Sequence, residues 1–147
     1  MTTVAYKNGI LAADTLVTAG DTRVDYETKI FKVGRYKFAL AGNIFAGYKI
    51  RDAILEGREF SGLQLPSLKR ENFNCLVADA NNLYFLDNEL YLQPINKNNC
   101  YALGTGDQYA LGAMAVGACA KKAVGIACEL DIYSGGKINE VRLSWAK

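Results

Sequence analysis

The second residue of the chain, Thr2, carries the atoms of both a nucleophile and a base. Methionine before a small residue such as threonine is usually removed, and removal of Met1 would leave a free α-amine on the carbon that bears the Thr2 side chain. The hydroxyl can attack a carbonyl, and an α-amine, with an ordinary pKa of about 7.7–8.0, can accept the released proton. While Met1 is attached, the Thr2 nitrogen is an amide without that basicity. Threonine at this position is common, so the residue alone indicates little.

The composition makes an amine base more relevant, because the sequence contains no histidine. This excludes Ser–His and Cys–His triads, imidazole bases and zinc sites that use histidine. The four cysteines form no C-x-x-C pair and match no metal-ligand spacing, so we expect reduced core thiols; they are Cys75, Cys100, Cys119 and Cys128. We therefore predict no metal and no cofactor.

The overall composition is that of a globular protein, with 50% hydrophobic and 22% charged residues among 147. This length predicts one domain over residues 1–147. Lys plus Arg number 17 and Asp plus Glu 15, and the resulting charge of +2 argues against nucleic acid as the main partner. The first residues lack the basic and apolar regions typical of a signal peptide, and no apolar run approaches the ~20 residues that span a bilayer. We expect a cytoplasmic protein without a membrane partner.

Patterns of apolar residues and turns predict the elements that must position Thr2. Asn8-Gly9 between residues 3–6 and 10–13 is typical of a tight hairpin, and a second hairpin is predicted over 29–33 and 36–41. Helical spacing is found over about 43–59, followed by a loop over 60–72. Further strands are predicted at 73–78, 83–86, 90–92, 101–104 and 138–143, and further helices at 107–118 and 121–130. This order favours an α+β domain of antiparallel sheets covered by helices.

Six short motifs follow one another in a specific order: Thr2-Thr3, Ala12-Ala13-Asp14, Lys29-Ile30-Phe31, Ala41-Gly42, Gly104-Thr105-Gly106 and Asp131-Ile132-Tyr133-Ser134-Gly135-Gly136. As a set they resemble the proteasome β-subunit and the bacterial protease HslV, which are N-terminal nucleophile hydrolases. The resemblance covers about residues 2–55 and 101–143. It implies a four-layer αββα sandwich of antiparallel sheets and a threonine peptidase. Without the resemblance, Gly104-Thr105-Gly106 could suggest a phosphate loop, but the Gly-Lys-Ser/Thr that completes one is missing.

The resemblance also implies catalytic roles. Thr2 matches the nucleophile, and Lys29 matches the lysine beside it, whose charge favours a neutral amine and a developing alkoxide. Asp14 matches the acid that holds this lysine, and Gly42 the glycine whose N–H forms the oxyanion hole. Three further matches support the amine and the lysine: Thr105, which stands where the family usually has serine, Asp131 and Ser134.

Substrate contacts are implied in the same way. Backbone groups at Thr18 and Gly42 would pair with an extended peptide as an added strand. Side chains near the expected pocket predict an apolar residue on the acyl side of the cleaved bond; they are Val17, Phe31, Leu40 and Ile44.

The function that follows is a threonine-type peptidase subunit of a self-compartmentalising, ATP-dependent protease acting on peptides or unfolded proteins. We expect a homo-oligomeric ring that works with an ATP-dependent unfoldase ring, and activation by methionine removal alone. The family has two long helices before the strand at 73–78, whereas this sequence has one helix and a remnant, so its ring size is not implied. Two alternatives stay open: a catalytically inactive scaffold or assembly protein, and an N-terminal nucleophile amidase acting on a small amide. The Lys29 match and Ser134-Gly135-Gly136 favour the peptidase over the amidase.

Overall fold

Antiparallel strand pairing organises the chain, which a computed structural model describes over residues 2–63 and 65–147. The elements of the N-terminal half are β1 (Val4–Lys7), β2 (Ile10–Ala13), β3 (Leu16–Ala19), β4 (Thr22–Tyr26), β5 (Ile30–Val33), β6 (Tyr36–Gly42), α1 (Ile44–Leu55) and the 3₁₀ helices η1 (Phe60–Gly62) and η2 (Pro66–Arg70). Those of the C-terminal half are β7 (Phe73–Ala78), β8 (Leu83–Asp87), β9 (Gln93–Ile95), β10 (Tyr101–Leu103), α2 (Asp107–Ala115), α3 (Ala120–Leu130) and β11 (Asn139–Arg142).

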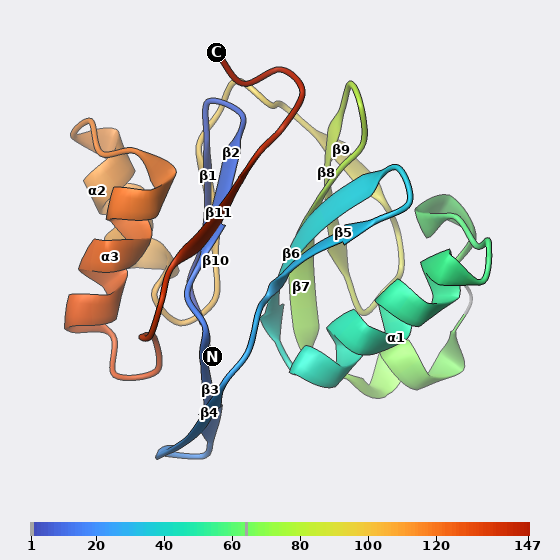
Figure 1. The fold of residues 1–147 in the computed structure, drawn as a ribbon, viewed down its shortest axis with the longest axis horizontal. Coiled ribbons are helices and arrows are strands. Elements are labelled where there is room, and N and C mark those ends of the chain that lie inside the picture. The colour runs from blue at the N-terminus through green and yellow to red at the C-terminus, as the bar shows by residue number, and fades with distance from the viewer. Residues whose placement is uncertain (1, 64) are drawn as a thin grey trace.

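The strands form two larger sheets and one hairpin (Figure 1). The first sheet has the order β10-β1-β2-β11, and the second has the order β5-β6-β7-β8-β9. All strand pairs are antiparallel, including the separate hairpin β3–β4. The turn between β1 and β2 uses Asn8 and Gly9 with φ angles of 51° and 79°, as the Asn-Gly motif predicted.

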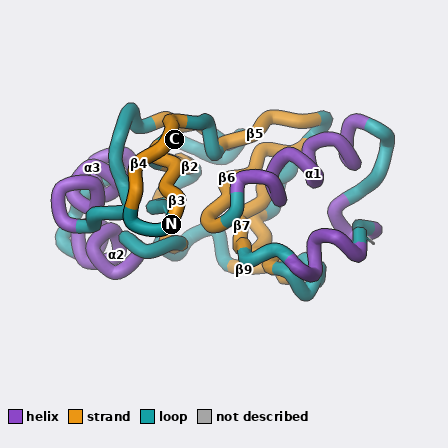
Figure 2. The backbone as a smooth tube through the Cα atoms, turned by 90° about the horizontal axis from the view of Figure 1, so that it is seen from below, coloured by secondary structure: helices purple, strands orange, loops and turns teal. Residues whose placement is uncertain are grey.

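The helices lie on the outer faces of the two sheets (Figures 1 and 2). Helices α2 and α3 pack on the four-stranded sheet, where Ala5 and Ala12 permit close approach. Helix α1 packs on the five-stranded sheet against Phe38 and Leu40. Between the sheets lies a third apolar cluster that includes Leu11 and many other residues of both sheets. Central strands such as β1 and β6 thus contribute to two apolar layers, because their side chains alternate between the two faces of the sheet.

Both predicted N-terminal hairpins and all three predicted helices are confirmed, but the strands differ from the prediction in two places. No strand was predicted at β3 or β4, and the side chains of β4 are all exposed, so they lack the alternating pattern of a half-buried strand. The strand predicted at 90–92 lies instead at β9, because Leu90 has a φ of 63° and continues a turn. Pro94 is accommodated because β9 is an edge strand.

The expectation of core cysteines is correct for Cys75 and wrong for Cys119, which is exposed at the start of α3. Burial raises the pKa of the Cys75 thiol, so that side chain is an inert part of the core. Within residues 2–63 and 65–147, no three His, Cys, Asp or Glu side chains are grouped as metal ligands. In the same described part of the chain, no helix has the length and apolarity needed to cross a membrane.

Candidate active site

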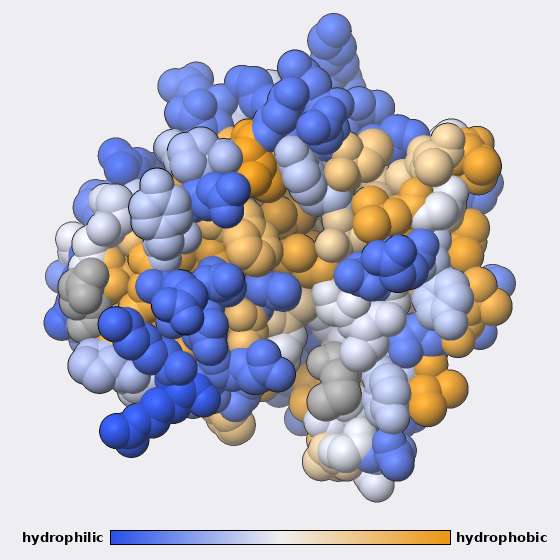
Figure 3. Space-filling model, turned by 180° about the vertical axis from the view of Figure 1, so that it is seen from behind, coloured by the Kyte–Doolittle hydropathy of each residue, from blue (hydrophilic) through white to orange (hydrophobic). Residues whose placement is uncertain are grey.

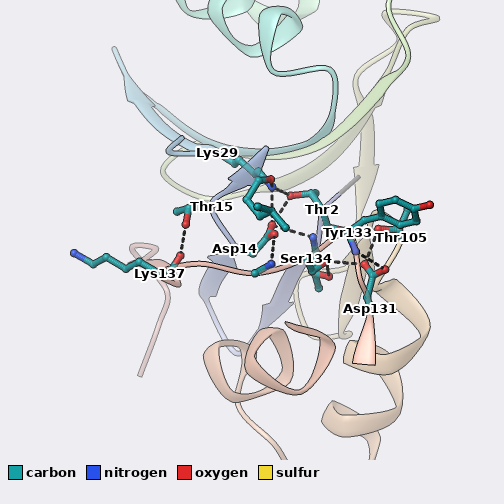
Figure 4. A network of polar contacts seen from close by, with 12 residues as sticks. Thr2, Asp14, Thr15, Lys29, Thr105, Asp131, Tyr133, Ser134 and Lys137 are labelled. Atoms are coloured by element: carbon teal, nitrogen blue, oxygen red, sulfur yellow. Dashed lines mark hydrogen bonds and ion pairs between the residues drawn. The ribbon is translucent and has the colours of Figure 1, made fainter. Parts of the chain in front are cut away.

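The carboxylate of Asp14, directly after β2, is the centre of a buried polar network (Figure 4). Its Oδ1 atom accepts from the Thr3 amide at 3.1 Å and from Lys29 Nζ at 2.8 Å, and it also contacts the Thr2 hydroxyl. Its Oδ2 atom accepts from the Gly135 amide at 3.0 Å. Both oxygens are therefore satisfied, which a carboxylate with no exposed area requires.

Lys29 directly precedes β5, and its ammonium group is directed at the Asp14 carboxylate and the Thr2 hydroxyl. It donates to Asp14 Oδ1, to the Leu16 carbonyl oxygen at 2.6 Å and to the Thr2 hydroxyl, so each of its three protons has an acceptor. Burial lowers the pKa of Lys29 below its usual value, and the nearby Asp14 carboxylate opposes that shift. The Thr2 hydroxyl thus lies between a buried cation and a buried anion.

A second network surrounds Asp131, the residue directly after α3. Its Oδ2 atom accepts from Thr105 Oγ1 at 2.6 Å and from Ser134 Oγ at 2.7 Å. Ser134 Oγ also lies 2.7 Å from Thr3 Oγ1, and the Thr3 amide donates to Asp14. Thr3 therefore joins the two acidic networks, a connection that the sequence interpretation did not include.

The loop 104–106 packs against the backbone of Thr2 and the side chain of Thr3. A Cβ atom on Gly104 would overlap the Thr2 carbonyl oxygen, and one on Gly106 would overlap Thr3 Oγ1. Gly106 N donates to the Thr2 carbonyl oxygen at 3.3 Å. The glycines of this motif are thus explained by close backbone approach to Thr2 and Thr3, and they need no phosphate ligand.

A cleft of about 450 Å³ opens beside this network. Its lining comprises Leu16, Val17, Thr18, Lys29, Gly42, Asn43, Ile44, Phe45 and Asn72. It therefore contains Val17, Thr18, Gly42 and Ile44 of the expected substrate-binding residues. Thr2 itself has no exposed area in the chain that carries Met1.

The other two expected pocket residues, Phe31 and Leu40, do not line the cleft. Both lie in the core beneath α1, where Phe31 also stacks on Phe38. Their placement follows from the alternation of side chains along a strand. Positions 31 and 40 are on the sheet face that α1 covers, whereas the cleft lies at the end of β6.

Gly42, at the end of β6, has a φ of 111° and no space for a side chain. A Cβ there would lie 2.8 Å from the Phe73 Cα atom and would overlap the Asn72 carbonyl oxygen. Glycine is therefore required by the backbone at the position where the cleft wall passes from strand to helix.

Four cleft residues were not predicted: Leu16, Asn43, Phe45 and Asn72. Asn43 had a readable signal, because asparagine directly before a helical pattern is typical of an N-cap, and its Oδ1 atom accepts from Phe45 N at 3.0 Å. Leu16 contributes its carbonyl oxygen to Lys29, and Asn72 contributes its carbonyl oxygen to the Asn43 amide. Any residue type supplies such groups, so the sequence contains no signal for them.

Comparison with known proteins finds similarity among solved structures only. No protein-family model matches the chain, and no curated protein matches it significantly in sequence. Among solved structures, BPH from Thiobacillus denitrificans matches with a TM-score of 0.68 and 23% identity, over 99% of this chain and 98% of that one. BPH in complex with epoxomicin matches with a TM-score of 0.67 and 24% identity, over 99% of each chain.

Eukaryotic HslV from Trypanosoma brucei matches with a TM-score of 0.69 and 17% identity, over 97% of this chain and 98% of that one. The match extends through the short region after α1, which the sequence motifs had left out. The chain therefore has the proteasome β/HslV-like fold that its motifs predicted.

Proposed function

We propose that this chain is a threonine-type peptidase in which Thr2 is the nucleophile once its amine is free. The observation that carries the proposal is the contact of the Thr2 hydroxyl with Lys29 Nζ, itself paired with Asp14 at 2.8 Å beside a cleft that Gly42 also lines. The proteasome β/HslV-like fold supports it. We interpret the arrangement of helices and sheets as the four-layer αββα sandwich of the N-terminal nucleophile hydrolases.

In the proposed reaction, the free α-amine accepts the proton of the Thr2 hydroxyl while Oγ1 bonds to the carbonyl carbon of the substrate. The Lys29 ammonium stabilises the negative charge that develops on Oγ1, and the Gly42 N–H stabilises the oxyanion. The α-ammonium then protonates the leaving nitrogen, the peptide C–N bond breaks and an acyl ester remains on Thr2. Water, deprotonated by the same amine, hydrolyses that ester.

The remaining residues position these groups. Asp14 holds Lys29 and the Thr3 amide, while Asp131, with Thr105 and Ser134, holds the segment that follows the nucleophile. We propose that an extended peptide pairs with backbone groups at Thr18 and Gly42, and that Val17 and Ile44 receive an apolar substrate side chain.

At the level of the cell, we propose a cytoplasmic homo-oligomeric ring that degrades peptides or unfolded proteins and receives them from an ATP-dependent unfoldase ring. This extends the likeness to HslV and BPH to assembly, and the single-domain organisation over residues 1–147 belongs to the same proposal.

Epoxomicin, with which BPH was solved, is a suitable probe. We expect intact-protein mass spectrometry to find one adduct on a chain that begins at Thr2, assigned to Thr2 by fragmentation, and none on a chain that retains Met1. Thr2→Ala should abolish the adduct, whereas Thr22→Ala, an exposed threonine of β4, should not change it. Lys29→Ala should slow labelling by about 100-fold or more, while Lys32→Ala, an exposed lysine of β5, should leave it unchanged.

Absence of an adduct and of peptide hydrolysis in the chain with a free Thr2 would contradict the proposal and favour an inactive scaffold. An adduct together with hydrolysis of small amides but not of peptides would favour the amidase. Peptide hydrolysis that persists in Thr2→Ala would assign the reaction to another residue.

A further inference from the structure

The Glu71 carboxylate, between η2 and β7, contacts the side chains of Asn43, directly before α1, and Lys49, within α1. Its Oε2 atom accepts from Asn43 Nδ2 at 2.6 Å, and its Oε1 atom forms an ion pair with Lys49 Nζ at 2.8 Å. The Glu71 side chain is only 19% exposed, compared with 52% for Glu59, which pairs with Arg35 on the surface. Glu71 is therefore held more tightly than an ordinary surface carboxylate.

Asn43, the partner of Glu71, has all its groups engaged at the junction of β6 and α1. Its Oδ1 atom caps the helix at Phe45 N, and its backbone N–H donates to the Asn72 carbonyl oxygen at 3.0 Å. Because a carboxylate only accepts hydrogen bonds, Glu71 requires the amide NH₂ of Asn43 to face it, which leaves Oδ1 facing the helix. Glu71 thus fixes the orientation of the cap.

This arrangement holds the peptide that follows Gly42. Through the φ and ψ angles of Gly42 it also restricts the preceding peptide, which carries the Gly42 N–H. Gly42 and Asn43 both line the cleft that Lys29 also lines, whereas Glu71 does not. On its other side, Gly42 is packed directly against the Asn72 carbonyl oxygen, the residue next to Glu71. We propose that Glu71, through Asn43 and with Lys49, is a positioning residue that fixes the Gly42 N–H in the oxyanion-binding orientation. This inference rests on the proposed function of Gly42.

Asn43→Asp tests the inference because it separates capping from the contact with Glu71. Aspartate caps a helix as well as asparagine does, but it cannot donate to Glu71 and places a second carboxylate beside it. The double variant Asn43→Asp/Glu71→Gln reverses the hydrogen bond, with the glutamine NH₂ now donating, and keeps the net charge of the pair. Glu71→Ala removes the contact, and Glu59→Gln is a control at a carboxylate outside the cleft.

We expect Glu71→Ala and Asn43→Asp, in the chain with a free Thr2, to lower kcat for peptide hydrolysis by about 10–100-fold while KM changes less than about threefold. The double variant should recover kcat to within about threefold of the wild type, and Glu59→Gln should match the wild type. Hydrogen exchange of the amides of residues 42–45, measured independently of activity, should be faster in both single variants and restored in the double variant.

Wild-type exchange rates in Glu71→Ala would overturn the inference whether or not the chain is a peptidase. Faster exchange with unchanged kcat, or a double variant as slow as Asn43→Asp, would also overturn it. If the wild type hydrolyses no peptide and forms no epoxomicin adduct, the proposed function fails, and with it the role assigned to the Gly42 N–H. Exchange then still reports whether Glu71 fixes the junction.

Discussion

At the scale of single residues, the pair formed by Asp14 and Lys29 governs the candidate site. A buried ion pair contributes little net stability, because desolvation of both charges offsets their attraction, but removal of one partner costs about 3–5 kcal/mol. Here the charges are also bonded to backbone groups of Thr3, Leu16 and Gly135, so each one fixes a different part of the chain. The pair is better explained by the placement of the Thr2 hydroxyl than by stability.

The lowered pKa of Lys29 predicts a particular dependence of stability on pH. The folded chain releases the Lys29 proton at a lower pH than the unfolded chain, whose lysine titrates near 10.5. Between these two pKa values the unfolded state binds more protons, so the free energy of unfolding rises with pH through this window. Compared with Lys29→Met, the wild type should therefore become relatively more stable as the pH approaches 10.5.

Denaturant unfolding at several pH values measures this difference. Lys32→Met, at an exposed position of β5, the strand that follows Lys29, is the matched control and should show no such trend. A difference between wild type and Lys29→Met that stays constant or falls with rising pH would contradict the explanation by burial.

At the scale of elements, the loop 104–106 holds Thr2, the proposed nucleophile, ahead of β1. The chain enters β1 directly after Thr2 and Thr3, and β10 pairs with β1 before the loop turns into α2. Because neither Gly104 nor Gly106 has a Cβ atom, the loop contacts the backbone of Thr2 and the hydroxyl of Thr3. The position of Thr2 is thus set by elements from both ends of the chain.

Gly106→Ala tests this contact without introducing backbone strain, since Gly106 has a φ of −92°. The added methyl group would displace Thr3 and lies 3.0 Å from the Ala127 Cβ atom, so we expect a loss of about 1–3 kcal/mol of unfolding free energy. Labelling of Thr2 by epoxomicin should fall with it.

Gly112→Ala, on the exposed side of α2, is the control, because no atom lies within 4 Å of its added methyl group. Alanine is the better helix former, so this variant should gain about 0.5–1 kcal/mol and label normally. Thermal or denaturant unfolding measures both effects. A Gly106→Ala protein as stable and as reactive as the wild type would show that the loop does not position Thr2.

At the scale of the whole molecule, the helices leave apolar groups on the surface. Val116, Ile132 and Leu130, near the ends of α2 and α3, are 88%, 68% and 57% exposed, and apolar surface is also visible on the face shown in Figure 3.

Between α1 and β7 the described residues form only η1 and η2. A ring built from this chain therefore uses shorter connections on that side than two long helices would provide.

The proposed ring predicts that light scattering coupled to size exclusion will give a mass of several times 16.1 kDa. Peptidase activity should elute with the assembly and decrease on dilution to monomers. A monomer of 16.1 kDa that retains full peptidase activity would contradict self-compartmentalisation while leaving the chemistry of Thr2 intact.

The sequence by itself predicted the candidate chemistry and determined most of the elements. The absence of histidine excluded imidazole catalysis, and the order of Thr2, Asp14, Lys29 and Gly42 predicted residues that the structure brings to one region. Local signals were sufficient for the elements, because turn residues and apolar periodicity act over short stretches of chain. The site residues followed from the resemblance that the ordered motifs carry.

Only the tertiary structure decided which groups meet across long separations. Phe31 and Leu40, predicted in the pocket, lie in the core. Thr3 connects the networks of Asp14 and Asp131, and Glu71 contacts Asn43. The sequence could not determine these contacts, because the surroundings of a strand side chain depend on which face of the sheet a helix covers. Backbone carbonyl groups such as those of Leu16 and Asn72 have no sequence signature at all.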